Sequence, residues 1–381
     1  MTLLIADPVV KADRQDTGPK RLDGLDVLRG AAVGAVLLGH SWPGVFQGAG
    51  IVGVIVFFVL SGYLITGVLA NDVERHGKVR YGRFYAHRAL RLLPALMAFL
   101  GVYAIVEVTA DVLGDRSKGI IGYTLLAGFG YLKDLPLPFD VSMAIGPLWT
   151  LAVEEQFYLI WPALLVVALR RNRQGRLIGW SAAVVYSLMA ASVLGMLILA
   201  PHLHSLVYAL PTTWSLGLVI GSALRLYRER MFSWFAGPRA RSGAWCGSAL
   251  VLAALVFVPR ANESPAFFFV GGPLAMAAAG VLVVLAASRT LAMPKWTRLL
   301  QLLGTVSYAA YLWNYIVILW LNGGSTADLP PGVAVSAILL TLLLAVISWH
   351  TVEKLGRRGR DRFDKYYQER IDDGVTTLRG S

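Results

Sequence analysis

The chain has 381 residues, of which 56% are hydrophobic and only 15% charged, and its mean hydropathy is +0.60. This balance excludes an ordinary soluble protein and a disordered one, because both carry far more polar residues. Long apolar runs that contain 39 Gly, 17 Pro and 11 Trp are typical of helices embedded in a bilayer. The sequence therefore predicts an all-α, polytopic membrane helix bundle.

Ten apolar runs are long enough to cross about 30 Å of hydrocarbon as helices. They lie at 24–42, 49–70, 89–108, 147–169, 177–200, 206–226, 244–258, 266–287, 300–321 and 330–350. A shorter stretch, 119–132, has 14 residues, four of them Gly, and is either an eleventh span or a re-entrant or interfacial helix. We expect a transmembrane domain at 24–352, an N-terminal tail at 1–23 and a basic C-terminal tail at 353–381.

The positions of the basic residues predict the direction of the spans. If 119–132 does not cross and the N-terminus is cytoplasmic, 29 of the 35 Lys and Arg lie in cytoplasmic segments. A crossing there would move the cluster at 170–176 outside and invert everything after it. Because Lys and Arg gather on cytoplasmic loops, we expect ten spans in the plasma (inner) membrane with both termini cytoplasmic. The same topology accounts for the net charge of +12, so no nucleic-acid partner is predicted.

Metal and disulfide chemistry have little support in the sequence. The single cysteine, Cys246, excludes an internal disulfide and a thiolate cluster. His202 and His204 lie two residues apart in a loop that offers no further ligand. The sequence therefore predicts no metal site and no permanently bound cofactor. It leaves open whether copies of the chain form a homo-oligomer.

Charged residues within the first span are costly in a bilayer and are candidates for function. Asp26, Arg29 and His40 lie there. Eleven residues at 100° each bring Arg29 and His40 to one helix face, about 16 Å apart along the axis. The alternative is an interfacial ion pair of Asp26 with Arg29 and a histidine held by a neighbouring carbonyl.

Basic residues also mark the mouth of the third span. Arg88 and Arg91 lie one helical turn apart, and Arg91 is the deeper of the two. Two guanidinium groups at this spacing suit a phosphate-bearing ligand, because each presents a rigid fork of donors. The alternative is a basic collar that sets topology.

Two carboxylates, Glu154 and Glu155, lie near the middle of the run GPLWTLAVEEQFYLIWP at 146–162. Because adjacent helical residues point 100° apart, we expect that the two cannot both face one partner. A buried carboxylate that pairs with a cation or stays neutral suits proton transfer or the orientation of a histidine. The alternative is a purely structural pair with Arg91 or Arg29.

Polar residues also follow one face of the span at 300–321. Ser307 and Asn314 are seven residues apart and share that face, which also suits packing between helices. Tyr308, Tyr311 and Trp313 lie in the same segment.

Five motifs together resemble the acyltransferase 3 family of integral membrane acyltransferases, and the resemblance covers roughly residues 20–355. They are RLDGLDVLRGAAVGAVLLGHSW (Arg21–Trp42), FFVLSGYLI (Phe57–Ile65), RFYAHRALRLLPAL (Arg83–Leu96), the run at 146–162 and the weaker SYAAYLWNY (Ser307–Tyr315). The resemblance implies transfer of an acyl group, usually acetyl, from cytosolic acyl-coenzyme A to a hydroxyl of a carbohydrate or another acceptor. Some members carry a periplasmic hydrolase-like extension; we expect none here, so the acceptor need not be the polysaccharide on which those members act.

The resemblance also implies roles for individual residues. His40 matches the catalytic histidine and Arg29 the essential arginine. Arg88 and Arg91 match an RxxR element proposed to meet the coenzyme A phosphates, and Glu154 matches the carboxylate of W-[ST]-L-x-x-E. The residues assigned to substrate binding are Asp26, Trp149, Tyr158, Tyr311 and Asn314. Asn314 departs from the family pattern, since many members have histidine there, and this leaves a proton-transfer role at that position in doubt.

The chemistry of acyl transfer agrees with these residues. A neutral imidazole can take the proton of an acceptor hydroxyl near neutral pH, and cations can hold a polyphosphate donor. The competing hypothesis is a transporter or flippase of an acyl or sugar-lipid group, with the buried Arg and Glu lining its pathway. The sequence names neither the acceptor, which ranges from cell-surface glycans and glycolipids to antibiotic sugars, nor the length of the acyl chain.

Overall fold

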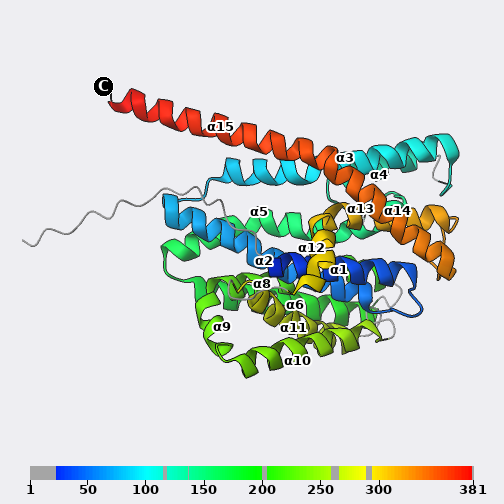
Figure 1. The fold of residues 1–381 in the computed structure, drawn as a ribbon, viewed down its shortest axis with the longest axis horizontal. Helices are drawn as coiled ribbons and strands as arrows, with labels where there is room; N and C mark the ends of the chain where they lie inside the picture. Colours follow the sequence, from blue (N-terminus) through cyan, green and yellow to red (C-terminus); the bar gives the residue numbers. More distant parts are fainter. Residues whose placement is uncertain are drawn as a thin grey trace, which may run out of the picture.

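The computed structural model describes residues 23–114, 118–135, 137–199, 204–258, 266–288 and 294–379. All regular elements within these ranges are helices, arranged as an elongated bundle (Figure 1). They are α1 (Asp23–Ser41), α2 (Ala49–His76), α3 (Tyr81–Ala110), α4 (Lys118–Phe129), η1 (Met143–Leu148), α5 (Trp149–Arg170), α6 (Gln174–Leu199), α7 (His204–Ala209), α8 (Pro211–Leu226), α9 (Arg228–Trp234), α10 (Pro238–Val256), η4 (Phe267–Gly271), α11 (Gly272–Ala286), η5 (Lys295–Thr297), α12 (Arg298–Thr305), α13 (Ser307–Leu321), α14 (Pro331–His350) and α15 (Val352–Arg379).

The apolar helices confirm a multi-pass membrane bundle. Among the described residues, seven helical segments are long and apolar enough to cross a bilayer, or eight if the bent pair of α12 and α13 forms one span. The two remaining predicted spans correspond to α1 and α10, which have 19 residues each. Helices of that length rise about 28 Å, close to the thickness of the hydrocarbon. The expected N-terminal tail lies almost entirely outside the described residues.

The short apolar stretch at 119–132 forms α4, which folds back beside α3 (Figure 1). Its 12 residues rise only about 18 Å, too little to cross. The loop that follows α4 runs back beside this helix. The contact is seen where the Ser142 amide donates a 2.8 Å hydrogen bond to the Thr124 hydroxyl. Helix α5 then ends where α3 begins, since Arg170 donates to the carbonyl of Gly77 at 3.5 Å. The bundle therefore contains α4 as a non-crossing helix.

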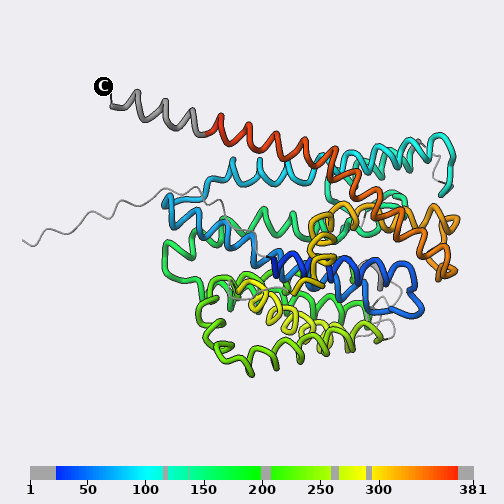
Figure 2. The backbone as a smooth tube through the Cα atoms, viewed as in Figure 1, coloured from blue at the N-terminus to red at the C-terminus, as the bar shows by residue number. Residues whose placement is uncertain are grey.

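The run at 300–321 was expected as one continuous span, but it is broken at Val306. Helices α12 and α13 meet there at an angle of 69° (Figure 2). Close packing against α1 explains the break, because α12 crosses α1 with almost no space between the backbones. A Cβ atom on Gly30 would lie 1.9 Å from the Leu300 carbonyl oxygen, and one on Gly304 would lie 2.0 Å from that of Asp26. Only glycine fits at both crossing points.

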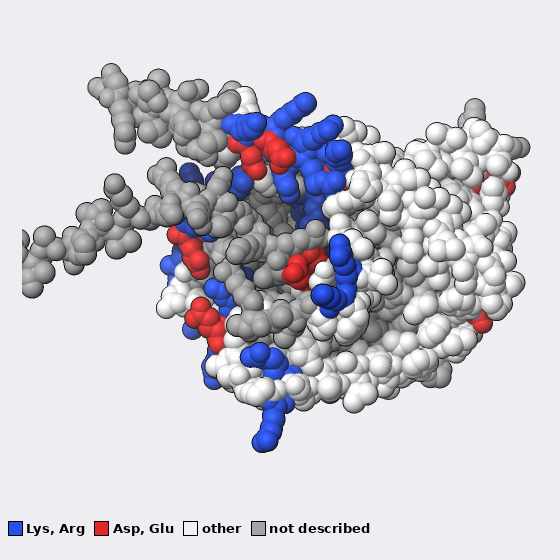
Figure 3. Space-filling model, in the orientation of Figure 1, with Lys and Arg blue, Asp and Glu red and all other residues white. Residues whose placement is uncertain are grey.

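The charged side chains divide the bundle into two ends. Lys and Arg gather at the end where α15 leaves the bundle, on the left of Figure 3. We call this the basic end; α2 and α5 finish there and α3 begins, and its residues include Arg75, Arg80 and Arg170. We call the opposite end, where α1 finishes and α2 begins, the His40 end.

The predicted C-terminal tail is a helix whose first half packs on α3. Asp364 of α15 accepts hydrogen bonds from Arg83 at 2.8 Å and forms a 2.7 Å contact with His87. Gly356 lies so close to α3 that a Cβ atom there would be 2.1 Å from the Leu90 carbonyl oxygen. Glu353, at the start of α15, is buried. This segment therefore holds the mouth of α3 in place.

Candidate active site

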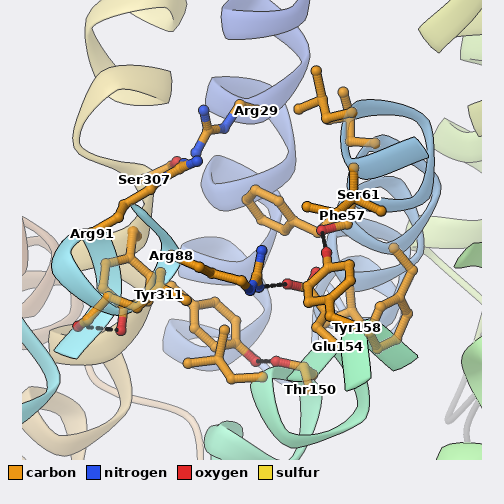
Figure 4. A pocket seen from close by; sticks show the side chains of 18 of the residues that line it. Arg29, Phe57, Ser61, Arg88, Arg91, Thr150, Glu154, Tyr158, Ser307 and Tyr311 are labelled. Atoms are coloured by element: carbon orange, nitrogen blue, oxygen red, sulfur yellow. Dashed lines mark hydrogen bonds and ion pairs between the residues drawn. The ribbon is translucent and has the colours of Figure 1, made fainter. Parts of the chain in front are cut away.

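A central cavity of about 200 Å³ lies between α1, α2, α3, α5 and α13 (Figure 4). Its polar lining residues come from all five sequence motifs and from positions far apart in the chain. They are Arg29, Ser61, Arg88, Arg91, Thr150, Glu154, Tyr158, Ser307, Tyr308 and Tyr311. The fold therefore gathers the charged residues of the first, third and fifth helices, which the sequence could only mark one helix at a time.

Arg88 is the centre of a charge network in this cavity. Its guanidinium donates to both carboxylate oxygens of Glu155, at 2.6 and 2.9 Å to Oε1 and 3.1 Å to Oε2, and lies 3.8 Å from Glu154. It also lies over the Tyr158 ring, 3.6 Å from the ring centre. The expectation that the two carboxylates cannot face one partner is wrong. A guanidinium is wide enough to reach both across the 100° between them.

The partner of the carboxylates also differs from the alternative of a structural pair with Arg91 or Arg29. Arg88 pairs with Glu155, which leaves Arg91 with no hydrogen bond or ion pair to any described residue. Arg91 is exposed at the cavity, and Figure 4 shows it and Arg29 pointing toward Ser307 at the start of α13. The buried carboxylate of Glu353 is near enough to act electrostatically on both arginines. The positive charge at this point of the cavity is suited to an anion.

Hydroxyl groups form another part of the wall of the central cavity. Ser61 hydrogen-bonds the Tyr158 hydroxyl, and it also contacts Glu154. The Tyr311 hydroxyl lies 2.8 Å from that of Thr150 and donates to the Pro147 carbonyl at 2.9 Å. These bonds fix the orientation of the tyrosines, because a buried hydroxyl without a partner is costly. Ser61 was not assigned a role from the sequence, although it lies in the motif FFVLSGYLI.

His40 lies outside the central cavity, at the far end of α1. It lines a separate cavity of about 600 Å³, which we call the His40 cavity and whose other lining residues include Gln47, Tyr315 and Asp328. Its Nδ1 is 2.7 Å from Oδ1 of the buried Asn314, and the Tyr315 ring packs edge-on at 5.1 Å. With Oδ1 accepting, Nδ1 carries the proton and Nε2 keeps its lone pair. The histidine is thus held in the tautomer that a general base needs.

The structure places the predicted site residues in three groups. The central cavity holds Arg29, Arg88, Arg91, Glu154, Tyr158 and Tyr311, whereas His40 pairs with Asn314. Trp149 packs among Phe58, Tyr208 and Trp214 and lines a third cavity. Asp26 is buried where α1 crosses α12 and lines none of these cavities. His202 lies outside the described residues, and the rest of the described chain contains no group of three or more side chains placed to bind a metal ion.

Comparison with known proteins identifies the family of this chain. Residues 22–350 match the model of an acyltransferase domain, that of the acyltransferase 3 family. The chain is 29% identical over 345 residues to peptidoglycan O-acetyltransferase OatA of Listeria monocytogenes, covering 87% of this chain and 54% of that protein. It is 31% identical over 353 residues to the putative peptidoglycan O-acetyltransferase YrhL of Bacillus subtilis, with coverage of 87% and 54%.

A third relative, O-acetyltransferase OatA of Staphylococcus aureus, is 28% identical over 355 residues, covering 88% of this chain and 57% of that protein. The chain thus spans about half the length of the curated relatives it matches. No solved structure matches it. The five motifs, the all-helical membrane bundle and a family match over most of the chain agree, and the chain belongs to the acyltransferase 3 family of membrane acyltransferases.

Proposed function

We propose that this protein is a membrane O-acyltransferase that moves an acyl group, in the simplest case acetyl, from acyl-coenzyme A to a hydroxyl of a carbohydrate-containing acceptor. One observation carries the proposal: α1 holds a cation at the central cavity and a general base at the other cavity, about 16 Å apart along its axis. The names of the relatives, peptidoglycan O-acetyltransferases, support a glycan of the cell wall as acceptor class.

The donor is expected to enter from the basic end, with its phosphates held by Arg91 and Arg29. Arg91 can offer its whole fork of donors to a phosphate, because no described residue occupies it. Arg88 contributes positive charge but is already bonded to Glu155, so its main part is to hold Glu154 and Glu155 in place. A cavity of about 200 Å³ suits the slender arm of coenzyme A better than its nucleotide.

The reaction itself takes place between the thioester and the acceptor hydroxyl near His40. Nε2 of His40 takes the hydroxyl proton while the acceptor oxygen attacks the thioester carbonyl carbon. The carbon–sulfur bond then breaks, and the leaving thiolate takes the proton back from the imidazolium. The products are an ester and free coenzyme A, so no other reactant is needed.

This mechanism requires the basic end to face the cytosol, because acyl-coenzyme A is cytosolic. Cysteine labelling tests the orientation in a Cys246→Ser background, which removes the exposed native thiol. We expect Arg171→Cys to resist an impermeant thiol reagent added to intact cells, whereas Ser325→Cys, in the exposed loop at the His40 end, is labelled. The reverse pattern would refute the orientation.

Product analysis tests the reaction. The protein in nanodiscs is given acetyl-coenzyme A labelled in the acetyl group and soluble peptidoglycan fragments, and ester and free thiol are measured together. We expect both to form in equal amounts, and His40→Ala to lower the rate of both by about 10² to 10⁴ while the exposed His350→Ala does not. Movement of an acyl or sugar-lipid group across proteoliposomes without a new ester would instead support the transporter.

A further inference from the structure

A third cavity, of about 450 Å³, has no part in the mechanism above. We call it the Trp149 cavity. It lies among the loop after α4, the start of α5 and helix α7. Its lining residues are Lys133, Leu135, Leu137, Phe139, Asp140, Val141, Gly146, Trp149, Tyr208 and Ala209.

The lining combines aromatic rings with charges of both signs. Trp149 and Tyr208 pack edge-on with ring centres 5.1 Å apart, and Phe139 adds a third ring. Lys133 and Asp140 form no hydrogen bond or ion pair with any described residue, so their charged groups are available to a ligand. An acyl chain would need a wall without charges. Aromatic faces beside polar groups suit a sugar ring, whose C–H face packs on aromatics while its hydroxyls bond to charged side chains.

Only a thin wall separates the Trp149 cavity from the His40 cavity. Gly146 lines the Trp149 cavity, and a Cβ atom on it would lie 3.2 Å from the ring of Tyr315. Tyr315 in turn lines the His40 cavity and packs on His40 itself. The two cavities are therefore neighbours, with the Gly146–Tyr315 contact between them.

The rim of the His40 cavity is held rigidly and is polar. Asp328 accepts a 2.7 Å hydrogen bond from the Gly44 amide, and the Leu329 amide donates to the Ser41 carbonyl at 3.3 Å. These bonds tie the loop before α14 to the turn that follows His40. Asp328 stays exposed and Gln47 half-buried, so both present polar groups to a ligand that reaches the histidine.

We propose that the acceptor is an oligosaccharide bound across both cavities. The reacting sugar lies in the His40 cavity, against Asp328 and Gln47, and a neighbouring sugar lies in the Trp149 cavity, with Tyr315 between them. Both volumes fall within the range of about 300–1,000 Å³ that is usual for small-ligand sites. This inference rests on the proposed function and adds that the enzyme prefers a chain over a single sugar.

The test compares acceptors of increasing length with the protein in nanodiscs. The probes are N-acetylglucosamine and its β-1,4-linked dimer and tetramer, with labelled acetyl-coenzyme A as donor. We expect kcat/KM to rise roughly tenfold or more from the single sugar to the longer acceptors. Asp140→Asn and Tyr208→Ala should remove most of this preference by raising KM for the longer acceptors.

Matched controls separate the cavity from general damage. Tyr186→Ala changes an exposed tyrosine of α6, and Glu229→Gln changes an exposed carboxylate at the basic end; both should keep the wild-type preference. If Tyr208→Ala does not fold, Asp140→Asn alone decides, because Asp140 is exposed. Equal kcat/KM for all three probes, or an unchanged preference in Asp140→Asn, would overturn the inference and leave the proposed function standing. No ester with any probe or with peptidoglycan fragments would overturn both.

Discussion

The central cavity and the His40 cavity both contain residues of helix α1, but their polar groups are stabilised in different ways. In the central cavity, charges are bonded to one another: Arg88 lies against Glu155, Glu154 and Tyr158. In the His40 cavity a single pair, His40 with Asn314, is enough. The difference follows from depth, because an ion far from water must be neutralised within the protein, whereas a neutral imidazole near the end of a span needs only orientation.

The comparison also separates two kinds of cation within the central cavity. Arg88 is committed to its carboxylates, while Arg91, one turn further along α3, is exposed at the cavity. One arginine thus maintains the site, and the other remains available to a substrate. Adjacent members of one sequence motif therefore need not share one role.

The largest effect is expected at His40. Removing a positioned general base costs about 10² to 10⁴ in rate, so His40→Ala should lower kcat by that amount while coenzyme A binding is unchanged. Parallel measurements of turnover and of donor affinity in nanodiscs check this. A loss of donor affinity equal to the loss of turnover would show that the two ends of α1 do not act separately.

The main effect of replacing Arg88 is expected to be a loss of stability of the folded protein. Arg88→Ala leaves two carboxylates without their cation, and breaking a buried pair in this way costs about 3–5 kcal/mol, less here because the pair keeps some exposure. Thermal unfolding in detergent should show a large fall in Tm. The double variant Arg88→Met with Glu155→Gln should recover part of the fall. An Arg88→Ala variant as stable as the wild type would contradict a structural role for Arg88.

Arg91 is expected to affect donor binding instead. A charged hydrogen bond contributes about 1.5–3 kcal/mol, so Arg91→Ala should weaken coenzyme A binding roughly 10- to 100-fold. Arg91→Lys keeps the charge but loses the fork, and should weaken it less. Calorimetry in nanodiscs measures both, with the exposed Arg173→Ala as control. Unchanged affinity in both Arg91 variants would move the donor site elsewhere.

The smallest effect concerns the loop after α4. Asp134 is fully buried there, and burial raises its pKa to about 6. The folded state therefore binds this proton more tightly than the unfolded chain, so the ionised carboxylate destabilises the fold above pH 6. Asp134→Asn should raise the stability at pH 7.5 by at most about 3 kcal/mol, and the gain should shrink from pH 6 toward pH 4. Tm measured against pH checks this; a gain that grows on acidification would contradict it.

The sequence by itself determined the class of the protein, the positions of its spans and the motif residues. Hydropathy and helical period are local properties, so they located α1 with Arg29 and His40, and the motifs led to the correct family. The helical period led to a wrong expectation for Glu154 and Glu155. It describes directions on one helix and takes no account of the width of the arginine side chain that faces both carboxylates.

Only the tertiary structure decided which side chains pair with each other. Arg88 and Glu155 are 67 residues apart, and His40 and Asn314 are 274 residues apart, so no periodicity within one helix could pair them. The break at Val306 and the docking of α15 on α3 likewise depend on how closely two backbones can approach at Gly30, Gly304 and Gly356. Hydropathy records the preference of each segment for lipid, whereas the choice of neighbour depends on packing between segments that are distant in the chain.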